Sequence, residues 1–216
     1  GFSKIHGFEL ALNMQNQLKS LGVNIKFRNI IGVKKNEDST FTVKASNGEE
    51  YHSKFVILAL GSKPKTLDIY NEHKYLGRGI SYCATCDGSF YKDKDVIVVG
   101  GGNSAITEAL YLASICNKVT IVARNELRAS KAELEKLLSK NNVVIKKHSS
   151  IMSLIEDNNK LVGVRIKDST NDEVYNENVD GIFVYIGSTA PTSFLQNLNI
   201  VKENSYINVN ENFETE

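Results

Sequence analysis

The fold is decided by the stretch Asp95-Val-Ile-Val-Val-Gly-Gly-Gly-Asn-Ser-Ala105. It places Gly100, Gly102 and Ala105 at the three positions of a G-x-G-x-x-G/A motif, after an apolar strand and before a helical pattern. Gly100 permits a tight turn, Gly102 lets the backbone approach a pyrophosphate, and the small Ala105 lets the helix pack closely on the strand. The stretch therefore predicts a dinucleotide-binding turn. The alternative is a glycine-rich strand–helix turn that binds no ligand.

Two further groups are expected beside the nucleotide. Backbone amides at the start of the helix, at Asn103 and Ser104, are suited to bind the phosphates directly. After the next strand, an NAD-binding protein usually carries an acidic residue for the ribose 2′-hydroxyl, whereas an arginine suits the 2′-phosphate of NADP. Arg124 and Arg128 follow that strand here, which favours NADPH. The alternative is that both arginines are solvated loop residues.

A cysteine pair lies ahead of the glycine turn, in Cys83-Ala-Thr-Cys86, and Asp87 follows it at once. Two cysteines at this spacing can close a small reversible disulfide, and a helix start would lower the pKa of one thiol. Asp87 could supply or take the proton when the dithiol opens. Half of a zinc site would need a second cysteine pair or a histidine pair, which the sequence lacks, so no metal is expected. A structural pair of buried thiols is the other alternative.

The composition is that of an ordinary globular protein and excludes several classes. The 216 residues include 26 Lys+Arg and 25 Asp+Glu, and this near-neutral balance argues against a nucleic-acid partner. No apolar run approaches the roughly 20 residues that a membrane span requires, so no membrane contact is expected. The 3 cysteines do not suit a secreted disulfide framework, and a reducing compartment, the cytoplasm, is expected instead. The third, Cys116, is predicted to be a small apolar core residue.

The chain as a whole is predicted to be an α/β protein. Its first part is expected to hold a helix over 8–20 and strands over 23–27, 29–34 and 41–44. The apolar run Phe55-Val-Ile-Leu-Ala-Leu60 is expected to be a buried strand. Looser stretches over 61–79 and 187–191 mark two boundaries. Between them, alternating strands and helices predict a parallel sheet. The helices are expected over 104–114 and 131–140, and the strands over 96–99, 119–122, 143–146, 161–167 and 182–185, with an acidic turn region between the last two strands.

These motifs together resemble those of the low-molecular-weight thioredoxin reductases, a family of flavoprotein disulfide reductases. The resemblance extends over nearly the whole chain and is carried by Gly77-Arg-Gly-Ile-Ser-Tyr-Cys-Ala-Thr-Cys-Asp-Gly88, Val99-Gly-Gly-Gly-Asn-Ser-Ala-Ile-Thr-Glu-Ala-Leu-Tyr-Leu112 and Leu127-Arg-Ala-Ser-Lys131. It implies a Rossmann-like NADPH-binding domain over 65–187, which carries the cysteine pair. This domain would be inserted into an incomplete FAD domain made of 1–64 and 188–216, with hinge strands at 63–67 and 187–191.

The resemblance also implies the roles of the site residues. NADPH would reduce FAD, and FAD would reduce the Cys83–Cys86 disulfide. Cys86 would face the flavin, Cys83 would attack the disulfide of thioredoxin, and Asp87 would be the proton donor. Because the cysteines and the NADPH site share one domain, that domain would rotate between two orientations. A homodimer is implied for the full-length protein.

The sequence departs from the family pattern at three places. The G-x-G-x-x-G motif for the ADP part of FAD and the closing Gly-Asp motif have no counterpart, so the chain is expected to be the central portion of a longer protein. The basic signature His-Arg-Arg-x-x-x-Arg is shortened to Ala123-Arg-Asn-Glu-Leu-Arg128, and Ala59-Leu60-Gly61 replaces Ala-Thr-Gly. Two alternatives follow. One is a related flavin disulfide reductase that uses NADH, ferredoxin or a peroxiredoxin-type partner, and the other is a non-catalytic nucleotide-binding module.

Overall fold

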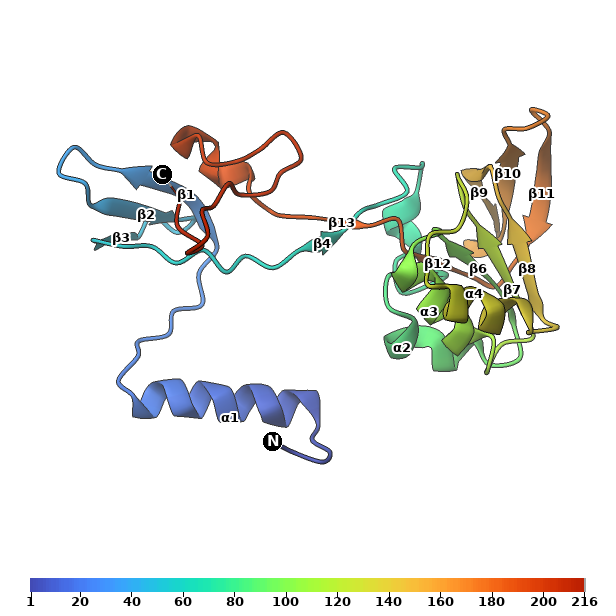
Figure 1. The fold of residues 1–216 in the computed structure, drawn as a ribbon, viewed down its shortest axis with the longest axis horizontal. Helices are drawn as coiled ribbons and strands as arrows, with labels where there is room; N and C mark the ends of the chain where they lie inside the picture. The colour runs from blue at the N-terminus through green and yellow to red at the C-terminus, as the bar shows by residue number, and fades with distance from the viewer. Residues whose placement is uncertain (216) are drawn as a thin grey trace. The chain divides into compact units, whose positions relative to one another are not determined.

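The structure is a computed structural model that describes residues 1–215 of the chain. The chain divides into two units. Unit 1 consists of Gly1–Ala59 and Thr192–Glu216, and unit 2 consists of Leu60–Pro191. Figure 1 labels most of their helices and strands. Within the described residues, no helix is both long and apolar enough to cross a membrane.

A parallel sheet of five strands lies at the centre of unit 2, as the alternating pattern predicts. In spatial order its strands are β5 (Ile80–Ser81), β12 (Gly181–Val184), β6 (Asp95–Val99), β7 (Lys118–Val122) and β8 (Val143–Lys146). Every pairing between neighbours is parallel. The continuous apolar run of β6 suits a central strand that has a neighbour on each edge and a covered layer on each face.

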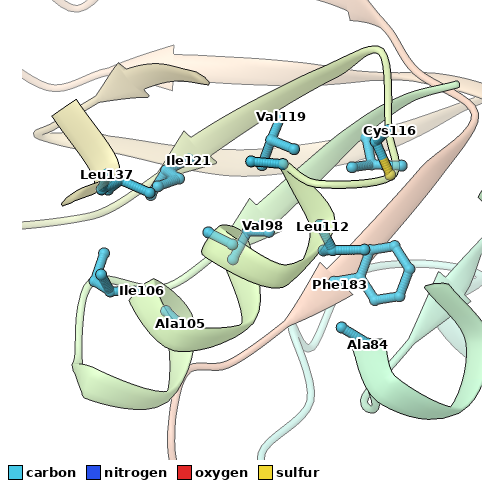
Figure 2. Close-up of a cluster of buried hydrophobic side chains, with 13 residues drawn as sticks. Ala84, Val98, Ala105, Ile106, Leu112, Cys116, Val119, Ile121, Leu137 and Phe183 are labelled. Carbon is cyan, nitrogen blue, oxygen red and sulfur yellow. The ribbon is translucent and has the colours of Figure 1, made fainter. Parts of the chain in front are cut away.

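One face of this sheet is covered by helices. The short helix α2 (Ala84–Asp87), α3 (Asn103–Leu112) and α4 (Lys131–Leu138) lie there, and Ser130 caps α4 by accepting the backbone N–H of Glu133. The cluster between helices and sheet is drawn in Figure 2. Ala105 is fully buried in it, so the helix approaches the strand closely, and Cys116 is a buried core residue as predicted.

An antiparallel sheet covers the opposite face. Its strands are β9 (Ser149–Asp157), β10 (Lys160–Asp168) and β11 (Val174–Asn178). Because side chains alternate across a strand, Val98 enters the helix-side cluster while Ile97 and Val99 pack with Ile166 on this side. The strand over 161–167 is confirmed as β10. The acidic region after it is not only a turn, because it contains β11, and β9 is an addition to the predicted elements.

In its described residues, unit 1 contains one long helix and a small antiparallel sheet. The helix α1 (Gly7–Ser20) confirms the expected helix, and the sheet joins β1 (Ile30–Lys35), β2 (Phe41–Ala45) and β3 (Glu50–Ser53). The hairpin between β2 and β3 turns at Gly48, which has a φ of 88°. The 3-10 helix η3 (Ser193–Leu198) packs on β1, where the Asn197 amide donates to the Val33 carbonyl oxygen at 2.8 Å.

Two predicted strands of unit 1 are wrong. Residues 23–27 and 55–60 are irregular, and the side chains of Phe55 and Ile57 are 85% and 94% exposed. The physical reason is the lack of a neighbour, since no strand in residues 1–215 pairs with either segment. A backbone without a ladder partner keeps its N–H and C=O groups in water.

Candidate functional site

The glycine turn between β6 and α3 has a conformation that explains its sequence. Gly100 has a φ of 137°, and a Cβ at this position would overlap the carbonyl oxygen of Tyr185. Only glycine therefore fits there. Gly102 has an ordinary φ of −89°, and a Cβ there would meet no atom within 4 Å. The space beside Gly102 is thus open to a ligand rather than filled by the protein.

A cavity of about 500 Å³ opens at this turn, at the carboxyl ends of β6 and β7. In parallel α/β sheets this edge is the usual place of ligand sites. Gly100, Gly102, Arg124 and Arg128 all line the cavity. The predicted residues Asn103 and Ser104 are the exposed first residues of α3 and do not line it, and Ala105 lies buried below.

The basic side of the cavity is built by the loop after β7. The Arg128 amide donates to the Gly101 carbonyl oxygen at 2.6 Å, which ties this loop to the glycine turn. Arg124 and Arg128 are exposed at the cavity wall. Glu126 also lines the cavity, but its carboxylate pairs with Lys147 at 2.6 Å, a contact that lowers its pKa. The two arginines are therefore not neutralised by this carboxylate, which already has a cationic partner.

The cysteine pair is closed as a disulfide at the start of α2, with a Cα–Cα distance of 5.2 Å. Cys83 caps the helix, since its Sγ accepts the backbone N–H of Cys86 at 3.2 Å. Cys86 is exposed, and Cys83 is half-buried. The disulfide is thus open to a partner from the outside, and Cys83 is held in place by helix capping.

Asp87 is connected to the cysteine pair through a serine that sequence reasoning missed. Ser81 Oγ donates to Asp87 Oδ2 at 2.7 Å and accepts the backbone N–H of Cys83 at 3.0 Å. This chain links the carboxylate to the backbone of the disulfide turn. Its only sequence signal is the position of Ser81 two residues before the first cysteine, which is weak.

A buried carboxylate, that of Glu72, connects the cavity wall to the segment just before the cysteine pair. Glu72 is 4% exposed, and it accepts the backbone N–H groups of Leu67 and Asp68 at 2.9 and 3.0 Å. It also accepts the hydroxyl of Tyr82, the residue before Cys83, and burial followed by this bond raises the pKa of Tyr82. Leu67 and Asp68 line the cavity. Glu72 thus ties one cavity wall to the cysteine segment, a role without a sequence motif.

No group of three or more His, Cys, Asp or Glu side chains suited to hold a metal ion occurs in the described part of the chain. For FAD, the fit can be tested in unit 1. Its sheet is antiparallel, and among its described residues no glycine turn joins a parallel strand to a helix. These residues therefore do not fit the FAD pyrophosphate in the way that the Gly100 turn fits that of a pyridine nucleotide.

Comparisons with known proteins identify the family of the chain. The family described as pyridine nucleotide-disulphide oxidoreductase matches residues 3–216. Thioredoxin reductase of Bacillus subtilis is 34% identical over 216 residues, which are 100% of this chain and 68% of that protein. Thioredoxin reductase of Mycoplasma pneumoniae is 37% identical over 217 residues, again 100% of this chain and 68% of the relative.

Among solved structures, the thioredoxin reductase of Lactococcus lactis in its FR conformation matches with a TM-score of 0.86 at 31% identity. This match covers 100% of the chain and 71% of that structure. The glycine turn and the cysteine pair thus lie in a chain whose full length aligns with such enzymes. The chain belongs to the pyridine nucleotide-disulphide oxidoreductases and, within them, to the low-molecular-weight thioredoxin reductases.

Proposed function

We propose that this chain carries the NADPH site and the redox-active disulfide of an enzyme that passes electrons from NADPH, through FAD, to thioredoxin. One observation supports the proposal most: residues 60–191 hold both the glycine-turn cavity and the Cys83–Cys86 disulfide. A nucleotide-binding module without catalysis would have no use for a closed cysteine pair beside a carboxylate.

The proposed nucleotide contacts follow from the cavity. The pyrophosphate would lie against Gly102, where the space is open, and near the amides of Asn103 and Ser104. The 2′-phosphate would meet Arg124 and Arg128, because a guanidinium binds phosphate oxygens through paired, charge-assisted hydrogen bonds. The ribose-facing position of an NAD enzyme would instead need a free carboxylate.

The proposed disulfide chemistry uses this chain's own groups. In the dithiol form, the Cys83 thiolate attacks one sulfur of the thioredoxin disulfide, and a mixed disulfide forms as that bond breaks. Cys86 then attacks Cys83, which closes the Cys83–Cys86 bond and leaves both thioredoxin sulfurs reduced. Two electrons pass to thioredoxin in this exchange. Asp87, held by Ser81, is the proposed group that exchanges the accompanying protons.

FAD is the proposed electron carrier between the nucleotide and the disulfide. When bound, FAD would supply the chemistry that takes two electrons from a hydride donor and delivers them to a disulfide. We assign no residue of this chain to the flavin, because the described residues of unit 1 lack a turn that fits it. We further propose the domain limits 65–187 with flanking FAD-domain segments, rotation of that domain, a homodimer, and a cytoplasmic location.

The nucleotide proposal is tested by isothermal titration of the chain with NADPH and NADH. We expect NADPH to bind more tightly, and Arg124→Ala with Arg128→Ala to weaken NADPH binding by roughly tenfold or more, about 1.5 kcal/mol for a lost charged hydrogen bond. NADH binding should change by less than about twofold. The matched control is Lys140→Ala, which removes an exposed cation that does not line the cavity. Equal affinity for both nucleotides would overturn the NADPH assignment.

The disulfide proposal is tested without flavin in a single turnover. The chain is reduced with dithiothreitol, desalted and mixed with oxidised thioredoxin, the mixture is alkylated, and the thiols of thioredoxin alone are counted from the mass of its alkylated form. We expect one thioredoxin disulfide to be reduced per chain, Cys83→Ser to be inactive, and Cys86→Ser to trap a mixed disulfide. Cys116→Ser is the matched control, and it should react like the wild type because Cys116 is a buried core residue outside the pair. Reduction of a peroxiredoxin-type protein but not of thioredoxin would overturn the proposed partner.

A further inference from the structure

Tyr185 is the residue that touches both halves of the site. It follows β12 directly, and its backbone N–H donates to the Val99 carbonyl oxygen at 2.7 Å. Its own carbonyl oxygen occupies the space that a Cβ of Gly100 would take, and the residue lines the cavity. At its other end, the phenol oxygen accepts the backbone N–H of Ala84 at 2.6 Å. Ala84 lies between the two cysteines.

The amide of Ala84 depends on this bond. Ala84 is fully buried as the first residue of α2, and in Figure 2 its side chain lies beside Phe183 in the core. The N–H groups in the first turn of a helix have no acceptor within the helix. A buried donor left without an acceptor carries its full desolvation penalty. The Tyr185 hydroxyl removes that penalty.

Three other amides of the cysteine turn find their acceptors locally. The Cys83 N–H donates to Ser81 Oγ, the Cys86 N–H to Cys83 Sγ, and the Asp87 N–H to the Cys83 carbonyl oxygen. Tyr185, by contrast, is 101 residues away in sequence. Its hydroxyl therefore anchors the turn to the rigid parallel sheet, whereas the local bonds only shape the turn itself.

We propose that Tyr185 is a positioning residue for the Cys83–Cys86 pair, whose hydroxyl holds the turn in the geometry of the disulfide and thereby favours the disulfide over the dithiol. The inference rests on the proposed redox role of the pair. In the disulfide form Ala84 already has its acceptor in the Tyr185 hydroxyl, which holds the turn in the closed geometry. When the disulfide opens, the covalent link between the two cysteines is lost and the turn gains conformational freedom. A turn that the hydroxyl already holds loses less conformational entropy when the disulfide closes again, so the bond favours the disulfide.

The Tyr185 hydroxyl is suited to this role because it stays protonated near neutral pH. Burial raises the pKa of Tyr185 to about 12, and the carboxylates of Glu108 and Asp87 act in the same direction. The bond from Ala84 opposes this change without reversing it. The acceptor for Ala84 therefore stays a neutral hydroxyl.

The test is the thiol–disulfide equilibrium with glutathione. Two glutathione thiols lose two electrons and two protons and become one glutathione disulfide, while the Cys83–Cys86 bond takes them up and becomes two thiols. In Tyr185→Phe we expect the equilibrium to move about tenfold toward the dithiol, which is about 30 mV for this two-electron couple. The matched control is Tyr175→Phe, which removes a hydroxyl bonded to Lys146 on another strand and should stay within twofold of wild type. A Tyr185→Phe value within twofold of wild type would overturn the inference.

A second measurement needs no variant and remains informative if Tyr185→Phe does not fold. Amide exchange of Ala84 is followed by NMR in the oxidised and the reduced wild-type chain. We expect strong protection in the oxidised form and at least tenfold faster exchange in the reduced form. Equal protection in both forms would contradict a preference for the disulfide. Neither measurement uses nucleotide or thioredoxin, so a failed electron transfer to thioredoxin would overturn the proposed function and leave this inference standing.

Discussion

Two apolar runs of similar sequence adopt different structures in this chain. Strand β6 is buried along Val96–Val99, between β12 and β7. The run Phe55-Val-Ile-Leu-Ala-Leu60 is irregular, and Phe55 and Ile57 are largely exposed. Both read as a buried strand in the sequence. The difference teaches that hydrophobicity selects a strand only where neighbours supply both a hydrogen-bonding ladder and a covering layer.

The energetics explain why both conditions matter. Full burial of a valine or isoleucine side chain stabilises a fold by about 1.5–3 kcal/mol, but the backbone must also exchange its water for protein partners. In β6 both happen at once, because β12 and β7 pair with its edges and two hydrophobic clusters cover its faces. For residues 55–60 the described chain provides no paired strand, and it leaves Phe55 and Ile57 uncovered.

The largest effect is expected from placing a charge in each run. Val98→Asp would bury a carboxylate without a partner in the helix-side cluster, and we expect a loss of more than about 4 kcal/mol, enough to unfold unit 2. Ile57→Asp should change the stability of the 216-residue chain by less than about 0.5 kcal/mol. Urea unfolding monitored by circular dichroism measures both. A large loss in Ile57→Asp would mean that 55–60 is buried, which would break the comparison.

A smaller effect is expected at two glycines of the turn between β6 and α3. Gly100→Ala forces a positive φ onto alanine and drives its Cβ into the Tyr185 carbonyl, so we expect a loss of roughly 3 kcal/mol. Gly102→Ala faces open space and should cost less than about 1 kcal/mol. Its main effect should be on ligand binding, because the added methyl group would hinder the pyrophosphate. We expect the affinity for NADPH to fall by roughly tenfold, or about 1.4 kcal/mol. Unaltered NADPH binding in Gly102→Ala would argue against a pyrophosphate at this position.

The smallest effect tests how well the core beside β6 excludes water. Burial raises the pKa of the Cys116 thiol from 9.0 to about 11, with the charges of Asp93 and Asp95 adding to the shift. Between these values the unfolded chain loses the proton and the folded chain keeps it, so stability falls as the pH rises from 9 toward 11. Cys116→Ala removes this slope. Urea unfolding of both proteins across that range should therefore show their stabilities converging.

Iodoacetamide at pH 8 gives an independent check on the same residue. After reduction, the native chain should gain adducts at Cys83 and Cys86 only, and the unfolded chain should also react at Cys116, because the thiolate is the reactive species. Mass spectrometry of tryptic peptides separates the three sites. Rapid native labelling of Cys116 would show that water reaches this part of the core.

Sequence reasoning missed the elements whose stability depends on distant partners. Strand β11 carries polar Asn176 and Asn178 and reads as a turn, yet it pairs with β10 along its whole length. Strand β9 mixes serine with apolar residues and becomes a strand because Ile151 packs into the cluster on the parallel sheet. Propensity and local pattern contain no information on such pairings, which are decided by the surface that the first sheet leaves uncovered.

The sequence by itself determined the βαβ core and its glycine turn, because a continuous apolar strand, a turn that only glycine can adopt, and an amphipathic helix are all local requirements. It also determined the cysteine pair, since that spacing is a property of the chain. Only the tertiary structure decided that Ser81 connects Asp87 to Cys83, that Tyr185 reaches Ala84 across 101 residues, and that Phe55 and Ile57 stay exposed. These facts depend on which segments become neighbours. The free energy that decides this comes from contacts between elements and not from any one stretch of sequence.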